Sequence, residues 1–174
     1  MVVLFDTSVL LLAIYPDAKP PVDPATDQPV EFAKQRVEYL IRSLSKERSK
    51  VIIPSPVLTE MLFHAGKATN EYVQSLQQSP FRIAPFDTRA AIECADVLHR
   101  FGMKGSGAGN PRAKVKFDRQ IVAIAQVERV ETIYSDDVDI YKYGGQAGIK
   151  VIRSYELELD PEDRQHKLDL NPES

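Results

Sequence analysis

The chain has 174 residues, of which 43% are hydrophobic and 27% are charged, and these values fit one globular domain with a buried core. The formal net charge of −3 excludes a protein-wide basic field, so contact with nucleic acid would need a local basic patch. A single cysteine, Cys94, excludes an intrachain disulfide and a cysteine-cluster metal site. No apolar run approaches the roughly 20 residues of a membrane span, and the N-terminus lacks the features of a signal peptide, so we expect a cytoplasmic protein without a membrane partner.

Short apolar runs alternate with helical patterns along the chain, beginning with Val2 to Phe5, which predicts a strand buried on both faces. We expect further strands or extended segments at residues 51–53, 81–86, 132–135 and 149–152. We expect helices at residues 9–14, 32–48, 55–65, 70–78, 88–101 and 114–129. The segments 16–30 and 102–111 are rich in proline or glycine and predict loops. This alternation predicts an α/β fold with an open, mostly parallel sheet and helices on both faces.

Two of the predicted strands end at acidic residues. Asp6 follows the first strand, and Asp136 and Asp137 follow the strand at residues 132–135. Because ligands gather outside the carboxyl ends of parallel strands, these acids should meet at one edge of the sheet. A simpler explanation exists for each of them, since aspartate also caps helices and favours turns.

Two further acids lie near the starts of predicted helices. Glu60 stands among apolar residues, where a favourable interaction with the helix dipole would explain it. Asp118 lies on a largely apolar helix, where a charge is costly unless it is paired or bound to a metal. The basic residues that could pair with it are Arg112, Lys114 and Arg119. Four carboxylates gathered at one edge would repel one another, which favours a bound Mg²⁺ or Mn²⁺, cations that prefer carboxylate oxygens.

The segments that carry these acids resemble, in order, the four motifs of the PIN-domain ribonucleases. They are Phe5–Leu10, Ser55–Glu60, Phe117–Ala125 and Ile133–Ile140. The resemblance covers nearly the whole chain and implies a three-layer α/β/α fold with a central parallel sheet. It also implies an acidic cluster that binds Mg²⁺ or Mn²⁺ and hydrolyses RNA phosphodiester bonds. Many small members are toxins of toxin–antitoxin pairs, similar to VapC, which implies an antitoxin protein as a possible partner.

Carried over residue by residue, the resemblance implies four catalytic acids that are also metal ligands: Asp6, Glu60, Asp118 and Asp137. Asp137 is chosen over Asp136 because the family pattern is a hydroxyl residue, any residue, then Asp. Ser8 and Ser135 are implied as supporting hydroxyls. Asp139 is expected either to support the ligands or to face solvent.

A basic segment from residue 100 to residue 116 leads into the helix of Asp118 and contains no acidic residue. Its glycines would let the backbone approach phosphates, and phosphate contacts give affinity without sequence information. The RNA-binding residues predicted in this segment are Lys104, Arg112, Lys114 and Lys116. The alternative is a solvated loop whose charges only keep the protein soluble.

We expect a PIN-like nuclease domain at residues 1–155 and an acidic C-terminal extension at residues 156–174. Exposed apolar side chains on the helices between residues 32 and 78 could serve a homodimer or an inhibitor. One alternative function is a PIN-like domain that binds RNA or a protein without cleaving it. A phosphatase with a nucleophilic aspartate is disfavoured, because Ser8 stands where that chemistry needs a second aspartate.

Overall fold

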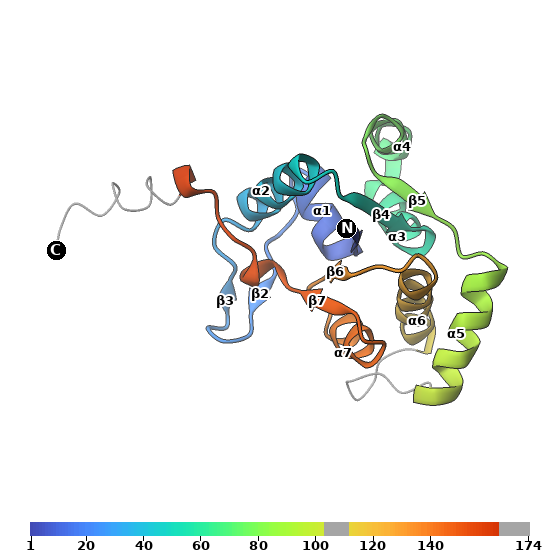
Figure 1. The fold of residues 1–174 in the computed structure, drawn as a ribbon. Helices are drawn as coiled ribbons and strands as arrows, with labels where there is room; N and C mark the ends of the chain where they lie inside the picture. The colour runs from blue at the N-terminus through green and yellow to red at the C-terminus, as the bar shows by residue number, and fades with distance from the viewer. Residues whose placement is uncertain (103–111, 164–174) are drawn as a thin grey trace.

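Figure 1 shows the computed structural model, which describes residues 1–102 and 112–163. Five strands form a parallel sheet in the order β5-β4-β1-β6-β7. The strands of this sheet are β1 (Val2–Phe5), β4 (Lys50–Pro54), β5 (Arg82–Ala84), β6 (Thr132–Tyr134) and β7 (Lys150–Ile152). The helices are α1 (Thr7–Ile14), α2 (Ala33–Lys46), α3 (Ser55–Ala65), α4 (Thr69–Gln78), α5 (Thr88–Phe101), α6 (Arg112–Val127) and α7 (Val138–Gln146). The predicted α/β fold with a parallel sheet is confirmed.

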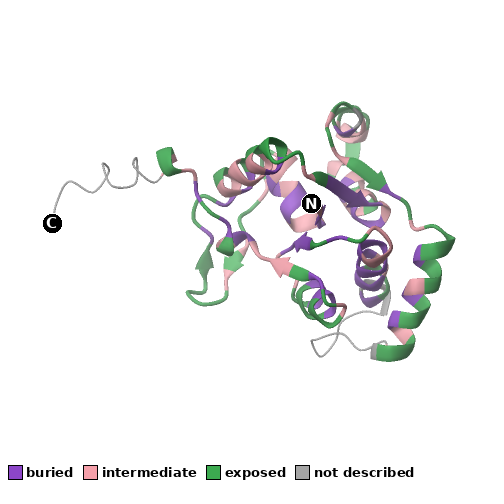
Figure 2. Cartoon of the chain, viewed as in Figure 1, coloured by how far each residue is buried: buried purple, intermediate pink, exposed green. Residues whose placement is uncertain are grey.

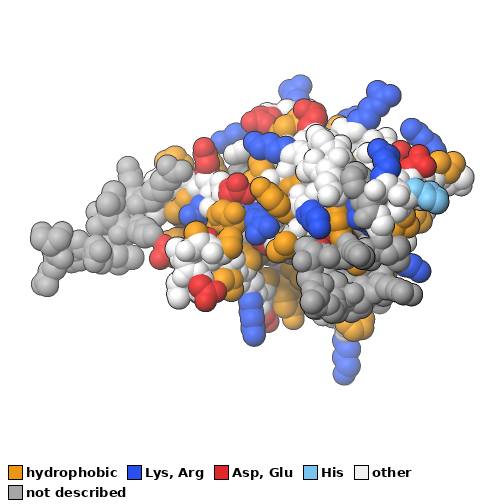
Figure 3. Space-filling model, turned by 90° about the horizontal axis from the view of Figure 1, so that it is seen from below, with side chains coloured by type: hydrophobic (Ala, Val, Ile, Leu, Met, Phe, Trp, Pro, Cys, Tyr) orange, Lys and Arg blue, Asp and Glu red, His pale blue; other side chains and the backbone are white. Residues whose placement is uncertain are grey.

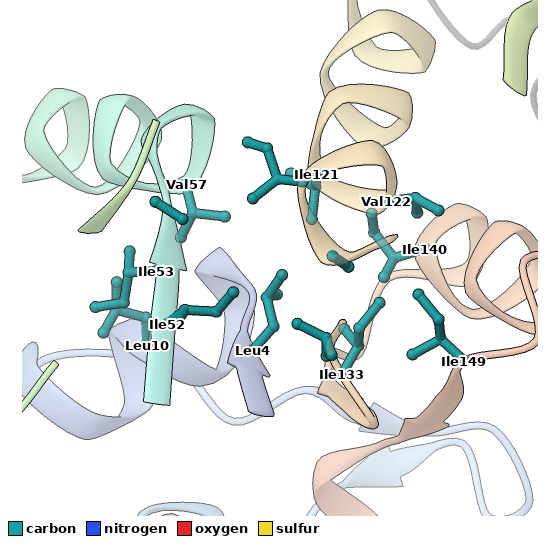
Figure 4. Packing of buried hydrophobic residues seen from close by; sticks show 14 of the residues in the cluster. Leu4, Leu10, Ile52, Ile53, Val57, Ile121, Val122, Ile133, Ile140 and Ile149 are labelled. Carbon is teal, nitrogen blue, oxygen red and sulfur yellow. The ribbon is translucent and has the colours of Figure 1, made fainter. Parts of the chain in front are cut away.

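The central strand β1 sends alternate side chains to opposite faces of the sheet, as strand geometry requires. Leu4 packs in a core with residues of α3, α6 and α7, and Figure 4 shows it lying between Ile52 and Ile133 of the neighbouring strands. Val3 and Phe5 pack in a second core with residues of α1 and α2. The sheet therefore lies between two layers of helices (Figure 1), as the three-layer prediction requires.

The most deeply buried helix is α6, which packs between α5 and α7. Figure 2 shows α6 buried along most of its length, whereas the outer side of α5 is exposed. The apolar run after Asp118, residues 121–125, is at most 2% exposed. Asp118, which precedes this run within α6, is therefore held close to the core.

Two segments differ from the sequence-based expectation. The proline-rich segment 16–30 contains a short antiparallel hairpin of β2 (Val22–Asp23) and β3 (Gln28–Pro29), too short to give a strand pattern. Helix α7 was not predicted, since adjacent glycines inside a helix lower its intrinsic propensity. Gly144 is required by packing, because a Cβ there would lie 2.6 Å from Cγ2 of Val151 in β7.

The chain beyond β7 packs back on α2. A short 3₁₀ helix, η2 (Ser154–Glu156), leads to Leu157 and Leu159, which are buried. The Arg36 guanidinium donates to the carbonyl of Leu157, and Arg42 Nη2 lies 2.6 Å from Asp160 Oδ2. The described start of the predicted acidic extension thus contacts the domain, and residues 164–174 lie outside the described residues. No helix in the described part of the chain is long and apolar enough to cross a membrane.

Candidate active site

Asp6 lies at the carboxyl edge of the sheet, where β1 meets β6. Its backbone N–H donates to the carbonyl of Tyr134 at 3.1 Å, which extends the β1–β6 ladder to the edge. Its side chain is 5% exposed, and Oδ2 accepts a 2.7 Å hydrogen bond from the Ser135 hydroxyl. The side chain therefore has a fixed orientation at the end of the central strand.

A pocket of about 320 Å³ opens at this edge. Its lining residues are Asp6, Thr7, Ser8, Glu60, Asp118, Asp136 and Asp137. The four acids singled out in the sequence thus come from four separate segments, at the end of β1, in α3, in α6 and before α7. The structure brings all four together in one pocket.

Asp137 is held in place as the N-terminal cap of α7. Its Oδ1 accepts hydrogen bonds from the N–H groups of Asp139 at 2.7 Å and Ile140 at 3.1 Å. Its own N–H donates to the Ser135 hydroxyl at 3.1 Å. The sequence suggested a turn as the simple explanation for this acid, and the structure gives it a helix-capping role together with a position in the pocket.

Three aspartates come closest to one another in the site. Asp118, Asp137 and Asp139 each offer a carboxylate oxygen, and these oxygens lie within 4.8 Å of one another. Asp118 is 6% exposed and Asp139 is 2% exposed. The alternative that Asp139 faces solvent is therefore wrong. The signal for its burial was the helical period of α7, which puts Asp139 and Tyr143 on one buried face.

Asp136 differs from its neighbour Asp137 in its hydrogen-bond partners. Its Oδ1 accepts hydrogen bonds from the Ser154 N–H at 2.9 Å and the Ser154 hydroxyl at 2.8 Å. Its N–H donates to the Ser8 hydroxyl at 3.0 Å. Burial raises the pKa of Asp136, while the hydrogen bonds from Ser154 and the charge of Arg153 lower it. Asp136 thus ties the pocket to η2.

Hydroxyl groups surround the remaining acids. The Thr7 hydroxyl donates to the Glu60 carboxylate. Glu60 lies on α3, the helix that directly follows β4. The Ser8 hydroxyl lies 3.4 Å from Asp6 Oδ2. Both candidate supporting serines therefore lie beside Asp6, Ser135 at the shorter distance.

The burial of these carboxylates has an electrostatic cost. Burial, with a smaller contribution from the charges of Asp137 and Glu60, raises the pKa of Asp6 to about 6, against the lowering effect of the hydrogen bonds from Ser135 and Thr7. A divalent cation would offset this repulsion, and the donors are the hard oxygen ligands that Mg²⁺ and Mn²⁺ prefer. The residues present therefore fit such a cation.

Arg119, the residue after Asp118 in α6, is buried. From the sequence, it is only a possible partner of Asp118. Arg119 is 1% exposed, and its Cζ lies 3.3 Å from the ring centroid of Tyr143. Burial lowers the pKa of Arg119, while Tyr143, Cys94, Asp139 and Asp118 act in the opposite direction. Arg119 therefore contributes positive charge to the same buried region as the aspartates.

The predicted RNA-binding segment falls mostly outside what the structure describes. Lys104 lies outside the described residues, and Arg112 and Lys114 lie in the first turn of α6, with their side chains outside the described part. Lys116 is exposed on α6. On the face seen in Figure 3, lysine and arginine side chains are scattered among hydrophobic and uncharged ones.

The fold and the pocket together define an α/β protein with a carboxylate site suited to a divalent cation. The family model of the PIN domain matches residues 30–146, more than half of the chain, so the chain belongs to the PIN-domain family. No curated protein matches the chain. The match begins after Asp6, so the position of Asp6 in the site is known from the structure.

Several solved structures share this fold. The structure of VapBC2 from Rickettsia felis, bound to a DNA fragment from its promoter, superposes with a TM-score of 0.56 at 16% identity, covering 88% of this chain and 98% of that one. DNA-bound VapBC from Salmonella typhimurium gives 0.56 at 15% identity, with the same coverage of 88% and 98%. A toxin–antitoxin complex from Klebsiella pneumoniae gives 0.54 at 18% identity, covering 89% and 99%. At these identities the similarity establishes the fold.

Proposed function

We propose that the chain is a metal-dependent endoribonuclease that hydrolyses RNA phosphodiester bonds. Its metal ligands and catalytic acids are Asp6, Glu60, Asp118 and Asp137, and its cofactor is Mg²⁺ or Mn²⁺. The observation that carries the proposal is the convergence of these four acids in one pocket, with Asp139 buried beside them. Membership of the PIN-domain family supports the reaction class.

A bound cation supplies Lewis-acid chemistry, which activates water and stabilises negative charge at the phosphate. The protein's part is to hold oxygen ligands in fixed positions. The Ser135 hydroxyl orients Asp6, and the capping hydrogen bonds of α7 orient Asp137. Glu60 is only partly buried, and we assign it to orienting the attacking water and accepting its proton, with Thr7 fixing one of its oxygens.

We further propose that the chain is the toxin of a toxin–antitoxin pair. The support is the shared fold with two DNA-bound VapBC structures and with a toxin–antitoxin complex. The partner would then be an antitoxin protein that covers the pocket or its approach. A homodimer stays a prediction, for which exposed Phe63 on α3 is a suitable contact residue at 83% exposure.

The test is cleavage of an end-labelled single-stranded RNA in Mn²⁺, Mg²⁺ or EDTA, with wild type and Asp6→Asn purified in parallel. We expect cleavage only with a divalent cation, and a loss of at least about 100-fold in Asp6→Asn, because losing a ligand removes several kcal/mol of transition-state stabilisation. Asp27→Asn, on the exposed hairpin, is the matched control. RNA binding without metal-dependent cleavage would favour the non-cleaving alternative instead.

A further inference from the structure

The aromatic ring of Tyr141, on α7, and the guanidinium of Arg153, directly after β7, lie together on the surface. The Cζ atom of Arg153 lies 4.7 Å from the ring centroid of Tyr141, at a distance typical of a cation–π contact. Tyr141 is 49% exposed, and Val138, three residues earlier on the same helix, is 54% exposed. Residues three apart in a helix are neighbours on its surface, so the ring continues an exposed apolar strip.

Both members of this pair connect directly to acids that line the pocket. The Tyr141 N–H donates to the carbonyl of Asp137 at 2.9 Å, which puts the ring one helical turn from the cap. Arg153 immediately precedes Ser154, whose N–H and hydroxyl hold Asp136. Tyr141 is therefore one helical turn from the pocket residue Asp137, and Arg153 is one residue from the group that holds the pocket residue Asp136.

Within residues 1–102 and 112–163, no carboxylate lies within ion-pair distance of the Arg153 guanidinium. Its Nε is buried without a hydrogen-bond partner in that same part of the chain. A guanidinium on the residue next to Ser154, which holds Asp136, adds positive charge beside a cluster of acids and reduces the local repulsion that a polyanionic ligand would meet.

Proteins that bind single-stranded nucleic acids combine aromatic side chains with positive charge, because every base has a π-face and every nucleotide has a phosphate. We propose that Tyr141 and Arg153 bind one nucleotide of single-stranded RNA beside the cleavage site, with its base on the exposed part of the Tyr141 ring and its phosphate on Arg153. This inference rests on the proposed ribonuclease function. It adds a stacking site that the basic segment does not supply, since no aromatic residue lies between Phe101 and Phe117.

The competing explanation is structural, since the same contact could only hold β7 and η2 against α7. The two explanations differ in what a substitution changes. A structural contact affects stability and leaves the salt dependence of RNA binding unchanged. A phosphate contact sets that salt dependence, because each neutralised phosphate releases a counterion.

The test is the affinity for a fluorescein-labelled mixed-sequence RNA 12-mer, measured by anisotropy from 50 to 300 mM KCl. It is run in EDTA, and again in Mg²⁺ on an Asp6→Asn background, so that no cleavage is needed. We expect Tyr141→Ala to weaken binding about 10-fold and Tyr141→Phe to bind within about twofold of wild type, because stacking needs the ring and not the hydroxyl. We expect Arg153→Gln to weaken binding and to lower the slope of log K against log salt by about 0.7.

A matched control exists in the same chain. Tyr39 and Arg42 of α2 form a second ring–guanidinium contact, with Cζ 5.9 Å from the ring centroid, and neither lines the acidic pocket. Tyr39→Ala should leave RNA affinity and its salt slope unchanged. Thermal unfolding of every variant shows which are folded, and Tyr141→Leu replaces Tyr141→Ala if the latter unfolds.

Unchanged affinity in Tyr141→Ala or Tyr141→Leu, with an unchanged slope in Arg153→Gln, overturns the inference. Absence of RNA binding both by the wild-type protein in EDTA and by Asp6→Asn in Mg²⁺ overturns it as well. These results are independent of cleavage. Metal-dependent cleavage with unaffected binding in the variants contradicts this site only, whereas lost binding in the variants without any cleavage contradicts only the nuclease activity.

Discussion

The two sides of the acidic pocket compensate buried carboxylates in different ways. On the β1 side, Asp6 and Glu60 are held by the hydroxyls of Ser135 and Thr7. On the α6–α7 side, Asp118 and Asp139 share their buried region with the guanidinium of Arg119. A hydroxyl orients a carboxylate without changing its charge, whereas a buried cation offsets that charge. Asp6, whose pKa is raised by burial, therefore depends on a bound cation to stay ionised.

The largest effect should come from replacing the buried arginine, Arg119. Arg119→Met keeps most of the side-chain volume and leaves buried acids without their positive neighbour, so we expect the free energy of unfolding of the metal-free protein to fall by about 3–5 kcal/mol. Chemical denaturation in EDTA measures this. Added Mg²⁺ should recover part of the loss, because it offsets the same acids.

The double variant Arg119→Met/Asp139→Asn sharpens this prediction, since removing a charge of each sign should cost less than the sum of the two single changes. Equal losses with and without Mg²⁺, together with additive single effects, would show that Arg119 acts only through packing.

The next effect concerns pH and the β1 side. The pKa of Asp6 is about 6 in the folded protein, raised chiefly by burial, against an ordinary value of 3.8. The folded state therefore holds this proton more tightly than the unfolded state does. The contribution of Asp6 to the free energy of unfolding is greatest below about pH 4. It falls by up to about 3 kcal/mol as the pH rises to about 6.

This pH dependence is checked by denaturation of the metal-free protein from pH 4 to pH 7, with Asp6→Asn as the comparison. The variant should lose the decline that wild type shows between pH 4 and pH 6. A wild-type curve parallel to that of Asp6→Asn would show that Asp6 does not titrate in this range.

A smaller effect should distinguish the two serines beside Asp6. The Ser135 hydroxyl bonds Asp6 and accepts from the N–H of Asp137, so Ser135→Ala should cost about 1–3 kcal/mol by leaving buried groups without partners. Ser8→Ala should cost less, because its contact with Asp6 is 3.4 Å long. Urea unfolding of both variants gives the comparison, and a larger loss in Ser8→Ala would reverse the proposed order.

The smallest change in activity should come from Asp136. Its carboxylate is committed to Ser154, so Asp136→Asn should lower RNA cleavage by about 10-fold or less, because an amide oxygen still accepts that hydrogen bond. Asp137→Asn should lower cleavage by at least about 100-fold, since it removes a proposed ligand. Initial cleavage rates at saturating Mn²⁺ measure both, and equal losses would assign Asp136 a direct role.

Much of the fold follows from local sequence, because buried parallel strands and amphipathic helices have strong patterns. The run Val2 to Phe5 predicts β1, and the order of the acids predicts which segments approach the sheet edge. The position of Asp6 follows from strand order, since β1 lies at the centre of the sheet. The strand periodicity could be read from one sequence, whereas the strand order is known from the structure.

The parts that were missed depend on tertiary packing. Helix α7 contains Gly144, which has poor helix propensity and is required because β7 approaches closely. Missing α7 also hid the burial of Asp139, whose side chain turns inward only if the segment is helical. The sequence offered Arg119 only as one of three possible partners of Asp118, and its burial against the Tyr143 ring is known from the structure.

The most direct test of the central claim is a crystal structure of the protein soaked in Mn²⁺, with anomalous scattering recorded to locate the ion. The account predicts an anomalous peak within coordinating distance of Asp118 and Asp137, with Asp6 facing it, and no such peak in Asp118→Asn crystals soaked in the same way. A wild-type structure with Mn²⁺ bound elsewhere and none in this pocket would contradict the account.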